Sequence, residues 1–275
     1  MKPVVLSLGA GVQSSTILLL SCKGLLTKID LAIFADTGWE RIATYQHLNW
    51  LETEAKAHGI PVIRVSNGDI RNPSTDRLKR LVTMPFYGVN GNEKSMLRRQ
   101  CTSEFKIVPI RRKIRELFDI PNHNPLGVGV ELWLGISTDE EKRVKGYFGV
   151  KYAEPNFPLI KILPMSRTDC LLWLKQNYPE HIPVKSACVG CPFHDNNEWR
   201  DIQRSPDEWK QAVEFDKTIR YKGYNPKIKS TLYLHSKRIP LDEIDLRTEI
   251  EKGQLLFPSL EKMWGRQNDF LEVMK

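Results

Sequence analysis

Residues 6–16 read LSLGAGVQSST, a short apolar strand that runs into a glycine-rich turn and then into a helix. Gly9 and Gly11 let the backbone turn tightly, and Ser14 and Ser15 begin the helix. Exposed N–H groups at a helix start attract anions, and the serine hydroxyls add donors. The stretch lacks the Gly-Lys-Ser/Thr ending of a Walker A loop. The residues alone therefore leave two readings, an anion site or a tight connection with serine caps.

The same pattern continues outward along the chain. Further apolar strands are expected at 31–36, 61–66 and 131–137, and residues 41–58 carry apolar side chains at helical spacing. Strands that alternate with helices predict a parallel sheet flanked by helices, a Rossmann-like α/β fold.

Composition and length bound the class of protein. The 275 residues carry a formal net charge of +8, which fits a nucleotide or nucleic-acid partner or simply a basic surface. No apolar run is long enough to span a bilayer, and the N-terminus has no signal-peptide pattern, so we expect a cytoplasmic protein without a membrane partner. We expect an α/β nucleotide-binding domain over 1–165. A smaller helical region over 166–275 would carry the Cys-x-x-Cys pair, with a last helix near 257–275.

The opening stretch resembles the PP-loop of the adenine nucleotide alpha-hydrolase-like superfamily, whose usual pattern is Ser-Gly-Gly-x-Asp-Ser. Gln13 replaces the acidic residue, and phosphoadenosine phosphosulfate (PAPS) reductases have glutamine in that place. FADTGWERIATY, residues 34–45, resembles the Asp-Thr-Gly segment of the same family. The resemblance implies binding of an adenine nucleotide, either ATP or one of the PAPS or adenylylsulfate (APS) type. The nucleotide-binding residues that we predict are Ser7, Gly9, Gly11, Gln13, Ser14, Ser15, Asp36, Thr37, Lys106 and Arg143.

The cysteines indicate a metal site. Five cysteines in a reducing compartment favour metal or redox chemistry over disulfides. SACVGCPFH places Cys188 and Cys191 three residues apart, with a proline directly after the second. RRQCTSEFKIVPIRR resembles the cysteine segment of iron–sulfur APS reductases, with Cys101 on the first cysteine and Lys106 on the lysine. The resemblance implies that Cys101, Cys188 and Cys191 hold a [4Fe–4S] cluster with one iron open to another ligand.

Two other readings of these cysteines stay open. Cys101, Cys188, Cys191 and His194 would also make a Cys₃His zinc site. The other alternative is that Cys188 and Cys191 are a redox dithiol, or two small buried residues.

Three functions follow from these observations. The first is an enzyme that adenylates a nucleic acid or nucleoside, such as tRNA or DNA, and then transfers sulfur to it. The second is a PAPS or APS reductase-like oxidoreductase, although the chain has no cysteine after residue 191 to act as the usual nucleophile. The third is a zinc-stabilised module that binds a nucleotide or nucleic acid without catalysis. The sulfur or electron donor does not follow from the sequence.

Overall fold

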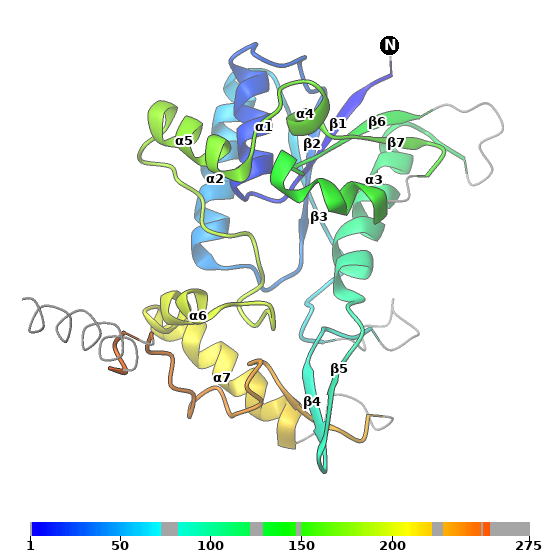
Figure 1. Cartoon of the computed structure of the whole chain (residues 1–275). Coiled ribbons are helices and arrows are strands. Elements are labelled where there is room, and N and C mark those ends of the chain that lie inside the picture. Colours follow the sequence, from blue (N-terminus) through cyan, green and yellow to red (C-terminus); the bar gives the residue numbers. More distant parts are fainter. Residues whose placement is uncertain are drawn as a thin grey trace, which may run out of the picture. The chain divides into compact units, whose positions relative to one another are not determined.

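The computed structural model describes residues 2–72, 82–121, 129–146, 150–221, 228–248 and 250–253 (Figure 1). The chain divides into two compact units. The first comprises residues 1–86 and 95–191, and the second comprises 87–94 and 192–275. The helix predicted near 257–275 lies outside the described residues.

A five-stranded parallel sheet forms the centre of the first unit and confirms the predicted α/β fold. Its strands are β1 (Val4–Leu8), β2 (Leu31–Asp36), β3 (Val62–Ser66), β6 (Val130–Leu134) and β7 (Ala153–Asn156). They lie in the order β3-β2-β1-β6-β7. The chain adds strands on one side of β1 and later on the other, so the order reverses between β1 and β6. In open α/β sheets, ligands bind at such a switch point, outside the carboxyl ends of the strands.

Helices cover both faces of this sheet. The helical segments are α1 (Val12–Cys22), α2 (Ile42–Ala57), η1 (Ser103–Ile107), α3 (Val108–Leu117), η2 (Thr138–Gly146), α4 (Pro158–Lys161) and α5 (Arg167–Asn177). Successive side chains of a strand point to opposite faces. Leu6 of β1 lies in one core with α1, α2 and α5, whereas Val5 lies in the other with Ile110 and Ile114 of α3. Burial on both faces explains why these strands read as unbroken apolar runs.

Helix α5 belongs to the first unit, whereas the sequence analysis placed its segment in the C-terminal region. Ser166 and Asp169 form a capping box that begins this helix. Cys170 and Leu174 are fully buried in the core that also contains α1. The apolar side of α5 is therefore covered by a helix from the start of the chain, not by the helices that follow it.

A π-helical turn, η1, leads directly into α3. The residue pattern predicts a helix over about 106–118, and in the structure the helical backbone begins earlier. Pro109 lies just after the π turn and has no N–H to donate to the preceding turn, so it lies where the regular α-helical hydrogen bonding is interrupted. Single π turns are frequent at functional sites, and this one carries Lys106.

The second unit combines a β-hairpin with two helices. Its elements are β4 (Tyr87–Asn90), the first residues of β5 (Glu93–Met96), α6 (Asn196–Gln203), α7 (Pro206–Tyr221) and β8 (Thr231–Tyr233), with β4 between β5 and β8. Residues 67–100 are polar, and their sequence predicts no strand. In the structure, Gly91, with a φ of 57°, turns the chain between β4 and β5. Within the described residues, no helix has both the length and the apolar character needed to cross a membrane.

Candidate functional site

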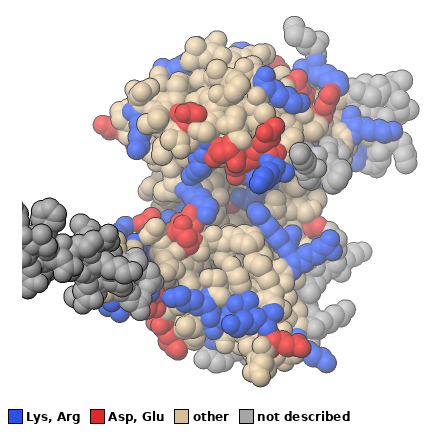
Figure 2. Space-filling model, viewed as in Figure 1, with Lys and Arg blue, Asp and Glu red and all other residues tan. Residues whose placement is uncertain are grey.

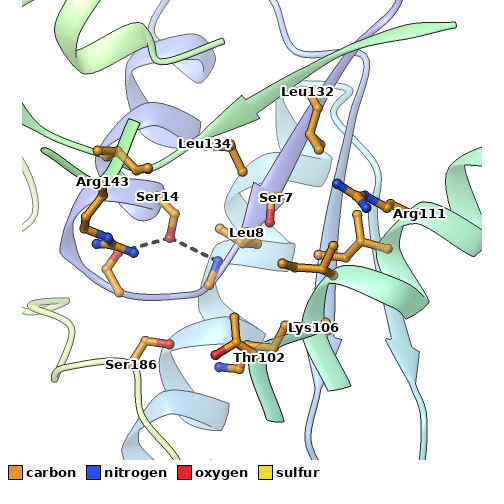
Figure 3. A pocket seen from close by; sticks show the side chains of 17 residues that line it. Ser7, Leu8, Ser14, Thr102, Lys106, Arg111, Leu132, Leu134, Arg143 and Ser186 are labelled. Carbon is orange, nitrogen blue, oxygen red and sulfur yellow. Dashed lines mark hydrogen bonds between the residues drawn. The ribbon is translucent and has the colours of Figure 1, made fainter. Parts of the chain in front are cut away.

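A pocket of about 360 Å³ opens where the carboxyl ends of β1 and β6 lie side by side. Its lining residues are Ser7, Leu8, Gly9, Gly11, Ser14, Ala35, Thr102, Lys106, Ile107, Ile110, Arg111, Leu132, Leu134, Gly135, Ile136, Arg143 and Ser186. Figure 3 shows Arg143 and Arg111 on opposite sides of the strand end that carries Ser7 and Leu8. Small-molecule sites usually measure roughly 300–1,000 Å³, so this pocket can hold a compact ligand.

The turn at Gly9–Gly11, here called the glycine loop, presents a helix start to this pocket. Ala10 has a left-handed backbone with a φ of 51°. Gly11 is the N-cap of α1 and makes no side-chain capping bond. Ser14 Oγ accepts the N–H of Gly9 at 3.1 Å and closes the loop. Because the first N–H groups of a helix lack intrahelical acceptors, this uncapped start suits a bound anion.

Close backbone approach explains two of the glycines around the pocket. A Cβ on Gly11 would lie 3.1 Å from Cβ of Ser186, and a Cβ on Gly135 would lie 2.9 Å from the backbone nitrogen of Ser14. The first contact is tight and the second is a clash. The start of α1 thus lies directly against the end of β6 and against the segment that leads into Cys188.

Cationic side chains give the pocket its charge. Lys106, Arg111 and Arg143 line it, and the described lining residues include no carboxylate. The Arg143 side chain is 61% exposed, and its Nη1 lies 2.5 Å from Oε1 of Glu140. An exposed ion pair of this kind is weak, so a phosphate in the pocket can replace Glu140 as the partner of Arg143.

Residues 188–191, here called the cysteine loop, dock on the segment that follows β2. The N–H of Val189 donates to the carbonyl of Trp39 at 2.9 Å, and the N–H of Cys191 donates to the carbonyl of Cys188 at 3.1 Å. Gly190 packs against the Trp39 indole so closely that a Cβ would lie 2.1 Å from a ring carbon. The glycine between the two cysteines is therefore fixed by the tryptophan after the Asp-Thr-Gly segment.

Glu40, which the sequence analysis did not single out, lies between the cysteine loop and the pocket. It is 3% exposed. Its Oε1 accepts from Thr37 Oγ1 at 3.0 Å and lies 2.9 Å from Lys106 Nζ and 3.9 Å from Cys188 Sγ. Its Oε2 is buried and has no hydrogen-bond partner among the described residues. Lys106 reaches the pocket as well, so this carboxylate connects the two parts of the site.

The buried groups around Glu40 influence one another's protonation. Burial opposes the charge on Lys106, but the carboxylate of Glu40 outweighs it and the pKa of Lys106 is raised. Burial, and then the charge of Glu40, raise the pKa of the Cys188 thiol. Thr37 Oγ1 lies 3.3 Å from Cys188 Sγ. Thr37, predicted to bind nucleotide, thus contacts the cysteine loop and not the pocket lining.

The three predicted metal-binding cysteines are not assembled as a ligand set. Within the described ranges, no group of three or more His, Cys, Asp or Glu side chains is placed to hold a metal ion. Cys188 and Cys191 lie in one loop, which the hydrogen bond from the N–H of Cys191 to the carbonyl of Cys188 closes. Cys101 directly precedes Thr102, which lines the pocket that Ser186 also lines. A metal site made of all three thiols would therefore draw its third ligand from a segment separate from the cysteine loop.

His194, the alternative fourth ligand, lies in the second unit with partners of its own. Its ring packs edge-on against Trp199 with centroids 4.9 Å apart. Its Nδ1 lies 3.4 Å from Oε2 of Glu198. These contacts anchor the histidine to the start of α6.

Gln13, predicted to contact nucleotide, holds a polar network and lies outside the pocket lining. Its Nε2 donates to Glu140 Oε2 at 3.0 Å and to Ser137 Oγ at 3.3 Å. Its Oε1 accepts from Arg167 Nη1 at 3.0 Å. The amide therefore connects the start of α1 to η2 and α5. It donates to Glu140 and accepts from Arg167, whereas an ionised carboxylate in its place could only accept.

Two further predicted nucleotide-binding residues also lie outside the lining. Ser15 is fully buried, and its hydroxyl lies 3.0 Å from His47 Nε2. Asp36 accepts from the N–H of Gly38 at 2.8 Å and from the hydroxyl of Tyr45 at 2.7 Å, which shapes the turn after β2. Ser7, Gly9, Gly11, Ser14, Lys106 and Arg143 do line the pocket.

Several site residues were missed because their sequence signals were faint. Thr102 and Ser186 are small polar residues one or two positions from a cysteine. Arg111 lies in a run of basic residues that gave no reason to choose it. Glu40 follows Asp-Thr-Gly-Trp, and only its burial beside Cys188 and Lys106 marks it as part of the site.

Comparison with known proteins gives fold-level similarity. No protein-family model matches the sequence, and no curated protein is significantly similar to it. A solved phosphoadenylyl-sulfate (PAPS) reductase from Candida auris, in complex with phosphate, is 14% identical with a TM-score of 0.38, over 64% of this chain and 73% of the reductase. The U34-tRNA thiolase NcsA from Methanococcus maripaludis, solved with its [4Fe-4S] cluster, is 13% identical with a TM-score of 0.40, over 89% of this chain and 82% of the thiolase. At such identities and TM-scores, neither structure assigns an activity or a ligand to this chain.

Proposed function

We propose that this chain binds an adenine nucleotide in the pocket at the glycine loop and uses it in sulfur chemistry. The observation that carries the proposal is the lining itself. An uncapped helix start and three cationic side chains meet at the switch point of a parallel sheet. The phosphates would lie at the glycine loop, between Arg143 and Lys106.

The rest of the lining suits a nucleobase and sugar. Apolar side chains line the pocket in addition to Lys106, Arg111 and Arg143. They include Ile107, Ile110, Leu132, Leu134 and Ile136. A planar base buries its faces against such side chains. The choice of adenine comes from the resemblance of the glycine loop to the PP-loop.

The leading reaction is sulfur transfer to a nucleic acid or nucleoside. A carbonyl oxygen of the acceptor attacks the α-phosphorus of ATP, and pyrophosphate leaves. A sulfur nucleophile then attacks the activated carbon, and AMP leaves with the former carbonyl oxygen. Lys106, Arg143 and the N–H groups of the glycine loop would hold the phosphates and stabilise the charge that builds on them.

The cysteines would supply the sulfur-handling part of the site. Cys188 and Cys191, with Cys101 as the third thiol, would hold a [4Fe–4S] cluster, with the ion pair of Lys106 and Glu40 beside Cys188. Such a cluster supplies an iron open to sulfur or substrate. Zinc, held by the same three thiols, is the alternative metal.

A second candidate is reduction of a PAPS or APS-type sulfonucleotide. The carboxylate-free lining favours it, because the described residues would bind phosphates through cations and N–H groups and offer no carboxylate to a Mg²⁺ ion. A thiol nucleophile beyond residue 191 is absent from the sequence. Cys22 and Cys170, which are not part of the proposed metal site, would then be the candidates for the nucleophile.

Nucleotide titration of a matched pair of variants tests the binding site. Arg143 lines the pocket, whereas its neighbour Lys142 is exposed and does not. We expect Arg143→Ala to weaken binding of ATP or PAPS by roughly tenfold, as expected for one charge-assisted hydrogen bond. Lys142→Ala should leave the affinity unchanged. Equal losses in both variants would mean that only net charge matters, and no binding by the parent protein would remove the proposal.

Metal analysis of protein purified without oxygen tests the cofactor. We expect brown protein with about four irons per chain. Cys101→Ser, Cys188→Ser and Cys191→Ser should each lower the iron content, and Cys22→Ser should not. Colourless protein with one zinc per chain would decide for the structural site, and metal-free protein would leave Cys188 and Cys191 as a dithiol.

A further inference from the structure

A second hollow lies on the outer side of α3, next to the nucleotide pocket. It has a volume of about 550 Å³. Its polar lining consists of Arg111, Arg112, Arg115, Glu116 and Tyr152, and all of these residues belong to the first unit. We call this surface the arginine groove. Lys and Arg side chains are spread over the face shown in Figure 2, so net charge alone would not have located it.

Helix geometry gathers these arginines on one side. Arg115 follows Arg111 by four residues and Arg112 by three, so the Arg115 side chain neighbours both of the others one turn further along the helix. Ile110 and Ile114 point the other way, into the core against the sheet. The amphipathic helix α3 therefore packs its apolar side against the sheet and has arginines on its other side.

Local contacts hold the guanidinium groups in place. Arg115 Nε donates to the carbonyl of Ile120 at 3.3 Å, and its guanidinium lies 5.7 Å from the centre of the Tyr152 ring. Arg112 Nη2 donates to the carbonyl of Ser66 at 3.4 Å. A guanidinium carries five N–H donors, so these contacts orient the groups and are far from using every donor of Arg112. Pre-ordered guanidinium groups bind phosphate oxygens with little further loss of entropy.

The one carboxylate among the described lining residues does little to cancel this charge. Glu116 Oε1 lies 2.5 Å from Lys113 Nζ, and its side chain is 62% exposed. Its negative charge is thus already balanced by a lysine on the same helix. The groove keeps a net positive character.

Arg111 lines both the arginine groove and the nucleotide pocket. An anionic chain that leaves the pocket past Arg111 therefore meets Arg112 and Arg115 next. Guanidinium pairs match phosphate oxygens, and an aromatic ring such as Tyr152 offers a face on which a base can stack. We propose that the arginine groove binds the sugar–phosphate backbone of a single-stranded nucleic acid and so brings its reacting nucleotide to the mouth of the neighbouring pocket, beside the phosphates of the bound adenine nucleotide. This inference rests on the proposed function for its biological meaning, because it assigns the acceptor a docking surface.

Binding of a labelled 12-nucleotide single strand, as RNA and as DNA, to the full chain tests the proposal. Fluorescence anisotropy is measured over a range of salt concentrations. We expect the double variant Arg112→Ala/Arg115→Ala to bind at least tenfold more weakly. Its log–log salt slope should be shallower by roughly 1.4, which corresponds to two lost phosphate contacts on a single strand. Loss for either the RNA or the DNA strand supports the groove and tells which acceptor it prefers.

Controls separate this result from trivial causes. Arg204→Ala removes the same charge from an exposed arginine outside the groove, 76% exposed and paired with Asp201, and should change nothing. If circular dichroism shows that the double variant is unfolded, Arg112→Ala alone should still reduce the slope by roughly 0.7. Unchanged affinity and slope, an equal loss in Arg204→Ala, or equally tight binding of a polyglutamate peptide would each overturn the proposal.

Nucleotide titration distinguishes a failure of the arginine-groove proposal from a failure of the proposed function. Arg112 and Arg115 do not line the nucleotide pocket, so the double variant should bind ATP like the parent protein. ATP binding without strand binding would remove the groove and keep the nucleotide site. Strand binding without ATP binding would keep the groove and remove the nucleotide site.

Discussion

Replacing Gly190 with alanine tests how the cysteine loop is held. Gly190 lies between Cys188 and Cys191, and its backbone is not in the left-handed region, so alanine is compatible with the backbone itself. The cost comes from Trp39. The new Cβ would lie 2.1 Å and 2.4 Å from two carbons of the indole ring, where carbon atoms normally stay about 3.5 Å or more apart.

The size of the effect follows from how firmly the indole is packed. Trp39 is 2% exposed, and the Arg71 guanidinium lies 5.3 Å from its ring centre. The ring or the cysteine loop must therefore move by more than 1 Å. Overpacking of this kind typically destabilises a protein by about 1–3 kcal/mol. For a protein of this size that corresponds to a loss of roughly 2–4 °C in melting temperature per kcal/mol.

Thermal unfolding of four proteins measures the effect: the parent, Gly190→Ala, Trp39→Leu and the double variant. We expect Gly190→Ala to melt several degrees lower. In the double variant the smaller leucine leaves room for the Cβ, so the two changes should combine to less than the sum of their separate costs. An unchanged melting temperature in Gly190→Ala, or strictly additive effects, would refute the packing that we describe.

Three further changes test other parts of the fold. Gln13→Leu removes both hydrogen-bonding groups of a buried amide, so urea unfolding should show a loss of about 1–3 kcal/mol in the free energy of unfolding. Gln203→Leu, at an exposed position, should change this free energy little. Asp216→Asn takes the carboxylate from the buried guanidinium of Arg220, so we expect a loss of about 3–5 kcal/mol; a loss under 1 kcal/mol would contradict this. Burial lowers the pKa of His47 to about 4, so the unfolded state binds more protons between pH 6.5 and 4 and stability falls as the pH falls. We expect His47 to account for about 2 kcal/mol of the stability lost between pH 7 and 5. His47→Gln should abolish this loss, and a pH profile of stability that is the same in His47→Gln and in the parent protein would disprove the explanation.

The fold was predictable wherever local pattern decided it. Unbroken apolar runs marked β1, β2 and β6, and the glycine loop marked the start of α1. Strand β7 was not predicted, because AEPN contains a proline and too few apolar residues to read as a strand. The hairpin of β4 and β5 was missed because all four residues of β5 are exposed, so no apolar alternation marks it.

The candidate site was predictable only in part, because its parts meet through tertiary contacts. The glycine loop, Lys106 and Arg143 have recognisable surroundings in the sequence and line one pocket. Glu40 has none, and only the folded chain places it against Lys106 and Cys188. Gln13 is predicted to contact nucleotide from its position, and only the folded chain shows that its amide bonds Glu140 and Arg167. A sequence motif identifies candidate residues, whereas the contacts of each side chain depend on its neighbours in the folded chain.

A crystal structure with a non-hydrolysable ATP analogue tests the central claim most directly. The account predicts phosphate oxygens within hydrogen-bonding distance of the N–H groups at the start of α1, with Arg143 turned from Glu140 toward them. Phosphates bound outside the pocket, or a pocket still empty at saturating nucleotide, would contradict it.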